Sequence, residues 1–86
     1  MSTTTHIDVQ PVESSQIYGV GYDPLTKRLA IRFKSKTGDP TSLYYYENVT
    51  PSDHAALILA ESIGSHFYKT IKPFPEKFPY RRIQEN

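Results

Sequence analysis

The sequence predicts an α+β domain: a three-stranded antiparallel β-meander packed against one helix, with a second short helix and an extended proline-rich C-terminal tail. Residues 28–34 alternate apolar and basic side chains with the period of two that is typical of a half-buried strand. Residues 50–53, Thr-Pro-Ser-Asp, are typical of a helix start, and an apolar stripe at helical spacing follows them. Asp-Pro and Gly-Asp-Pro sequences supply turns between the expected strands.

Length and composition limit the class of protein. The 86 residues are enough for one domain, and the absence of cysteine excludes disulfides, thiolate metal sites and a cysteine nucleophile. No apolar run approaches the roughly 20 residues of a membrane-spanning helix. We therefore expect a cytoplasmic protein (in the host cytoplasm if it is phage-encoded) that has no membrane partner.

The strand at residues 28–34 has the clearest pattern of the three. The strand before it, residues 17–22, is less regular, and a bulge at Gly19 or Gly21 would reconcile the spacing of its apolar side chains. The apolar residues near the N-terminus indicate at most a short edge segment that stops at Pro11.

The third strand, residues 43–48, contains three consecutive tyrosines. A turn centred after Gly38 gives two cross-strand pairs on the core face, Phe33 with Tyr44 and Ile31 with Tyr46. Tyr45 then lies on the opposite face, beside Arg32. Two interpretations of Tyr45 stay open: an aromatic side chain that stabilises the sheet, or an exposed ring on which a nucleobase stacks.

In the helical region, Thr50 is expected to cap the helix, Pro51 suits the first helical position and Asp53 complements the positive end of the helix dipole. Gly64 either ends this helix or kinks it into a second short one that ends near Ile71. One face of the sheet and one stripe of the helix predict the core, which comprises Leu29, Ile31, Phe33, Tyr44, Tyr46, Leu57, Ala60 and Phe67.

The chain is expected to have three parts: a flexible N-terminal tail at residues 1–11, one folded domain at residues 12–72 and a C-terminal extension at residues 73–86. Three prolines and three aromatic residues in the extension exclude a regular helix there. We expect the extension to lie across the domain and to use its aromatic side chains for contact.

No constellation of residues indicates catalysis or a metal. His54 and His66 are twelve residues apart, His6 is isolated, and none of these spacings is typical of a metal site. Nothing in the sequence positions a Ser–His–Asp arrangement, and the Gly-Val-Gly sequence lacks the helix and third glycine of a phosphate-binding loop. We therefore expect a protein that is not an enzyme and needs no cofactor or metal.

Four segments within residues 12–72 together form a recognisable pattern: VESSQIYGVGYD, LAIRF, YYYENV and LILAESIGSHFYKTIK. The pattern resembles the KTSC domain family, small domains found at the C-terminus of some lysyl-tRNA synthetases and as stand-alone bacterial or phage proteins. The resemblance implies a domain without an established activity, and the link to a synthetase implies RNA as a ligand.

Two hypotheses of function remain open. Basic residues interleaved with aromatic ones suggest a module that binds RNA or another nucleic acid. Residues 66–86 carry five basic against two acidic side chains. The candidate binding residues are Arg32, Lys34, Tyr45, Lys72, Lys77, Arg81 and Arg82. The alternative, which the low net charge of +1 favours, is a protein-interaction module, such as a small phage-encoded protein that acts on a host or cellular protein.

Overall fold

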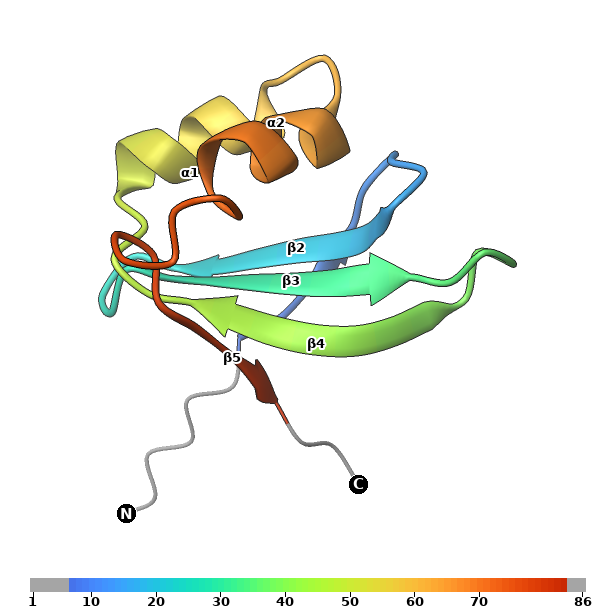
Figure 1. Cartoon of the computed structure of the whole chain (residues 1–86), viewed down its shortest axis with the longest axis horizontal. Coiled ribbons are helices and arrows are strands. Elements are labelled where there is room, and N and C mark those ends of the chain that lie inside the picture. The colour runs from blue at the N-terminus through green and yellow to red at the C-terminus, as the bar shows by residue number, and fades with distance from the viewer. Residues whose placement is uncertain (1–6, 84–86) are drawn as a thin grey trace.

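The computed structural model of the protein describes residues 7–83. Over this range the chain forms β1 (Gln10–Pro11), β2 (Ile17–Asp23), β3 (Arg28–Lys34), β4 (Pro40–Tyr46), α1 (Pro51–Ile58), α2 (Ile63–Thr70) and β5 (Tyr80–Ile83). The strands form one antiparallel sheet in the order β1-β2-β3-β4-β5, and both helices lie on one face of it (Figure 1). The α+β class is confirmed, but the sheet has five strands rather than the predicted three.

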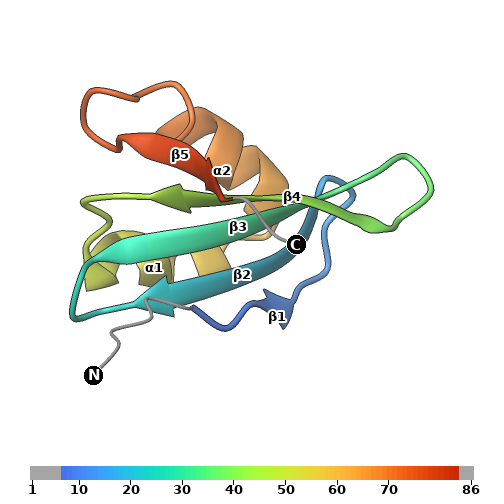
Figure 2. The ribbon, with the colours of Figure 1, turned by 90° about the horizontal axis from the view of Figure 1, so that it is seen from below.

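The two additional strands come from segments that were expected to be tails. β1 pairs with β2, and β5 pairs with the whole second half of β4, so these short strands form the two edges of the sheet (Figure 2). The proline-rich segment is not simply extended, because residues 71–77 form turns before β5 begins and Phe78 is buried in the core. Residues 1–6 and 84–86, which belong to the two expected tails, lie outside the described part of the chain.

The register of β3 against β4 differs from the prediction by two residues. Ile31 lies opposite Tyr44 and Leu29 opposite Tyr46, because the connecting loop is centred near Thr37 and the pairing is irregular after Arg32. The loop is closed by the Ser35 N–H, which donates to the Asp39 carbonyl at 2.8 Å. A shift of two residues leaves every side chain on its predicted face, so the faces of the three tyrosines are as expected.

The predicted bulge in β2 is confirmed, because the pairing with β3 shifts between Ile17 and Gly19. Gly19 and Gly21 have a second role, since residues 7–10 cross very close to β2. A Cβ atom at Gly19 would lie 2.8 Å from the Gln10 carbonyl oxygen, and one at Gly21 would overlap the Asp8 carbonyl oxygen. Glycine is needed at both positions because the neighbouring backbone leaves no space for a side chain.

The start of α1 is the predicted one. The Thr50 hydroxyl accepts from the Asp53 N–H at 3.1 Å, and the Asp53 carboxylate accepts from the Thr50 N–H at 3.2 Å, which makes a reciprocal capping box. A second short helix is also confirmed. It begins after Ser62, however, and Gly64 lies inside its first turn, where a Cβ atom would be 3.0 Å from the Ser14 hydroxyl. The expected break at Gly64 is therefore wrong.

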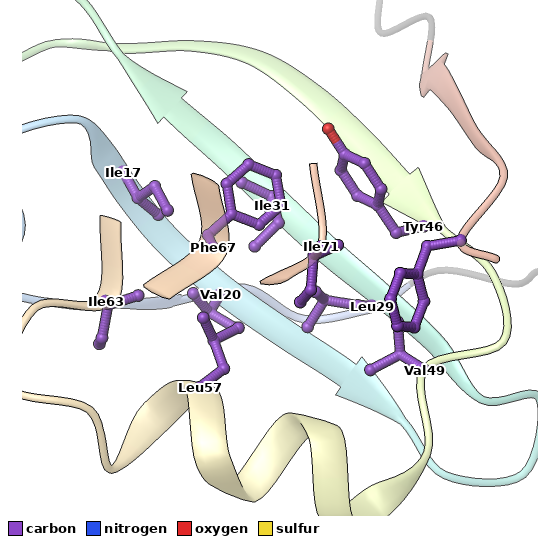
Figure 3. Packing of buried hydrophobic residues seen from close by; sticks show 11 residues of the cluster. Ile17, Val20, Leu29, Ile31, Tyr46, Val49, Leu57, Ile63, Phe67 and Ile71 are labelled. Carbon is purple, nitrogen blue, oxygen red and sulfur yellow. The ribbon is translucent and has the colours of Figure 1, made fainter. Parts of the chain in front are cut away.

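The main core lies between the sheet and the two helices (Figure 3). Five of the predicted core side chains are buried there: Leu29, Ile31, Tyr46, Leu57 and Phe67. Ala60 is only half-buried because α1 ends at Ile58, and Phe33 and Tyr44 are partly buried at the edge of the core. Among residues 7–83, no helix has the length and apolar character needed to cross a membrane.

Candidate functional site

Tyr45, the predicted stacking residue, is buried. Its ring is 4% exposed and lies on the sheet face away from the helices, in a second apolar cluster with Ile7, Ala30 and Leu43. The Ile7 N–H donates to the Tyr45 hydroxyl at 3.3 Å. The N-terminal segment thus covers this face, and the interpretation of Tyr45 as an exposed ring for a nucleobase is wrong.

The other candidate residues of the outer face are Arg32, which contacts the backbone of β4, and the exposed Arg81. An Arg32 guanidinium nitrogen donates to the Thr41 carbonyl at 2.7 Å. Arg81 lies opposite Tyr45 in the β4–β5 pairing, on the same face as the ion pair between Arg28 and Glu47. On this face the predicted stacking ring, Tyr45, is buried, and the half-buried Tyr18 lines a shallow depression with Arg32.

Three further candidates lie elsewhere. Lys34 follows the irregularity in β3–β4 pairing, and its ammonium donates to the Ser14 carbonyl at 2.6 Å instead of lying beside Tyr45. The Lys77 ammonium lies 5.1 Å from the centre of the Phe78 ring. The Lys72 ammonium lies 4.8 Å from the centre of the Tyr68 ring. The predicted residues therefore do not form one surface.

A groove on the helix side of the sheet is the better candidate. It has a volume of about 430 Å³ and lies between β4, β5 and the segment that follows α2. Lys72 is the one charged side chain among the residues that line it. Five aromatic rings line the groove, from Phe33, Tyr44, Tyr46, Tyr68 and Tyr80.

The sheet places these rings side by side. Tyr46 and Tyr80 are direct cross-strand partners, and their rings stack with centres 5.4 Å apart. The centre of the Tyr44 ring lies 5.9 Å from that of Tyr80 and 5.5 Å from that of Phe33, with which it forms a T-shaped pair. Tyr80 is 54% exposed while Tyr46 is buried. The row of rings is therefore accessible at Tyr80 and covered at Tyr46.

The groove is polar at the tips of its rings. Burial raises the pKa of the Tyr46 hydroxyl above its usual value, and the nearby hydroxyls of Tyr80, Tyr44 and Tyr68 raise this pKa further. Tyr46 therefore stays neutral at physiological pH and keeps its proton as a hydrogen-bond donor. Neutral hydroxyls, flat rings and one ammonium suit a planar ligand that carries an anionic group.

The sequence predicted Lys72 and Arg82 as binding residues but did not predict that aromatic rings line a groove beside them. Arg82 lies opposite Tyr44 in the β4–β5 pairing and so shares its face. The sequence prediction places Tyr80 in an extended tail, although the alternation of Phe78, Tyr80 and Arg82 is a strand pattern that indicates β5. Nothing in the local sequence indicates that Tyr68 of α2 faces this strand.

Of the two histidines in the described part of the chain, His54 packs against an aromatic ring. The His54 ring stacks on Tyr22 with centres 4.4 Å apart, and burial lowers the pKa of His54. The Tyr22 hydroxyl donates to the Val49 carbonyl. No group of three or more residues that could ligate a metal occurs within residues 7–83, and His6 lies outside that range.

Comparison with known proteins covers most of the chain. A family model described as the KTSC domain matches residues 13–78. A protein of Tsukamurella paurometabola is 46% identical over 65 residues, which cover 76% of this chain and 90% of that protein. A protein of Stutzerimonas stutzeri is 38% identical over 72 residues, covering 84% and 92%.

The crystal structure of a KTSC domain protein from Yersinia pestis has a TM-score of 0.75 at 35% identity, and it covers 92% of this chain and 100% of that one. The match to the family model includes every lining residue of the groove except Tyr80. Arg82 also lies beyond the matched range.

Proposed function

We propose that this chain, which belongs to the KTSC domain family, is a non-enzymatic module that binds single-stranded RNA through its aromatic groove. The composition of the groove carries the proposal: five aromatic rings and one lysine, with no carboxylate among the lining residues. Unpaired bases stack on aromatic side chains, and basic side chains contact the phosphates between them.

The exposed and buried rings have different roles in this proposal. Tyr80, with half of its surface accessible, and the half-buried Tyr44 offer ring surface to a base, whereas the buried Tyr46 supports them from below. Lys72 lies within the groove, and Arg82 stands on the same sheet face beside Tyr44. Since the net charge is only +1, the affinity comes mainly from stacking.

Replacing Tyr80 by alanine tests the proposal. We expect Tyr80→Ala to lose about 1–3 kcal/mol of binding free energy for a fluorescently labelled oligouridylate at low salt, because one stacking surface is removed. Its thermal stability is expected to change little, since more than half of the side chain is exposed. Tyr18→Ala is the matched control, because Tyr18 lies on the outer face beside Ile7 and Leu43.

Two results would overturn the proposal. One is the absence of oligouridylate binding to the wild-type protein at low salt. The other is an equal loss of affinity in the Tyr80→Ala and Tyr18→Ala proteins, since equal losses would show that the groove has no special part in binding.

A second function is favoured by one observation on α1. Leu57 is the only buried side chain of this helix, while Ile58 and Leu59 at its end are 44% and 81% exposed. Adjacent exposed apolar side chains are typical of protein interfaces. A cellular or host protein that binds there would be captured from nuclease-treated lysate by the wild-type chain and lost with Leu59→Ser, whereas Tyr80→Ala would still capture it.

A further inference from the structure

A second depression adjoins the aromatic groove. It has a volume of about 360 Å³ and is lined by polar residues of segments 15–16 and 34–36 together with two aromatic rings. These two rings, Phe33 and Tyr68, also line the aromatic groove. The two depressions are therefore neighbours on one side of the molecule, with the same pair of rings between them.

The second depression differs from the groove in its chemistry. Two lysines, Lys34 and Lys36, line it, and no carboxylate does. The Lys34 ammonium is held by the Ser14 carbonyl, whereas Lys36 is exposed in the turn after β3. Asp39, the acid of the same turn, accepts from the Thr37 hydroxyl at 3.0 Å. The depression is suited to the backbone phosphates of a ligand more than to its bases.

Two further cations lie along the aromatic groove, one at its β5 side and one within it. Arg82 shares the face of Tyr44 on the β5 side of the groove. The Lys72 ammonium lies in the groove over the ring of Tyr68, which both depressions share. Basic groups thus alternate with ring surfaces from β5, past α2, to the β3–β4 turn. Sites for single strands combine basic groups along the path of the backbone with rings on which successive bases stack, and both are present here.

We infer that the two depressions form one continuous track for an extended RNA strand of at least about four nucleotides, the lower end of the range for single-strand-binding folds. The bases lie over the aromatic groove, and the phosphates of the emerging strand meet Lys36, while the Lys34 ammonium stays on the Ser14 carbonyl. This inference rests on the proposed RNA binding and adds to it the length and the path of the bound segment.

Oligouridylates of increasing length test the track. For the wild-type protein, we expect the affinity to rise about tenfold or more between a dinucleotide and a hexanucleotide and then to level off. Lys36→Gln is expected to leave dinucleotide binding unchanged and to weaken hexanucleotide binding several-fold. Lys27→Gln, which removes the same charge from the exposed β2–β3 turn, is expected to alter neither.

The results separate the two proposals. If dinucleotide and hexanucleotide bind equally well, or if Lys36→Gln weakens both alike, the continuous track is refuted while RNA binding in the groove stands. If no oligouridylate binds the wild-type chain, the proposed function fails and the track with it. Thermal melting of each variant verifies that the fold is retained.

Discussion

At the scale of single residues, the three tyrosines of β4 show how one strand serves two surfaces. Tyr44 and Tyr46 line the groove, while Tyr45 faces the other way and holds the N-terminal segment through its hydroxyl. Strand alternation predicts this division, and the sequence therefore assigned each tyrosine to the right face. It did not reveal the cover over Tyr45, because the covering residue, Ile7, lies 38 positions away in the chain.

We expect Gly21→Ala to lower the free energy of unfolding by about 1–3 kcal/mol, the usual cost of forcing extra atoms into a packed site. The added methyl group would overlap the Asp8 carbonyl oxygen and come within 2.9 Å of the Ile7 side chain. Urea denaturation followed by circular dichroism measures this change.

The control for this substitution is a chain that lacks residues 1–9. Because the clash is with residues of that segment, Gly21→Ala should cost little in the shortened chain. An equal loss of stability in both backgrounds would mean that the strand itself, and not the crossing segment, requires glycine.

At the scale of elements, the sequence predicts a helix or strand correctly where the residues that determine it lie within one short segment. Capping residues predicted the start of α1, and the period-two pattern predicted β3. Gly64 was misinterpreted because its role is a close approach between α2 and Ser14, which no local pattern records. β5 was missed because the prolines before it indicated an irregular tail, although none lies within Tyr80–Ile83.

β5 supplies a matched pair of arginines for a prediction about RNA binding. Arg82 lies opposite Tyr44 on the groove side, and Arg81 lies opposite Tyr45 on the outer face. We expect Arg82→Ala to weaken oligouridylate binding by about 1 kcal/mol, the order of one hydrogen-bonded contact, and Arg81→Ala to have little effect. Fluorescence anisotropy titrations of both variants measure the difference. Equal losses of affinity would mean that RNA contacts both faces of β5 and would contradict an interface confined to the groove side.

At the scale of the whole molecule, the fold decides which charges act together. The sequence showed that basic residues collect toward the C-terminus, but residues close in sequence diverge in space, as Arg81 and Arg82 do. Lys36 comes from a turn, Lys72 from the segment that follows α2, and Arg82 from an edge strand. Only the folded chain brings these three residues beside one row of rings. The residue types of the candidate site were predictable, but their grouping was not.

This grouping predicts a shallow dependence of RNA binding on salt. Each phosphate neutralised on a single strand contributes about −0.7 to the slope of the logarithm of the binding constant against that of the salt concentration. Contacts from Lys36, Lys72 and Arg82 therefore give a slope of about −2, and affinity should fall roughly 15-fold between 50 and 200 mM salt. Titrations of a labelled oligouridylate at four salt concentrations measure the slope.

Removing one of the three cations should make this slope shallower by about 0.7, whereas Lys27→Gln should leave it unchanged. A wild-type slope steeper than about −5 would mean that many more cations contact the strand, including those of the outer face, and would contradict a site confined to the groove. A slope near zero would mean that no phosphate is bound. Because stacking on neutral rings does not depend on counterion release, such a result would leave the aromatic row as the only contact and would remove Lys36, Lys72 and Arg82 from the interface.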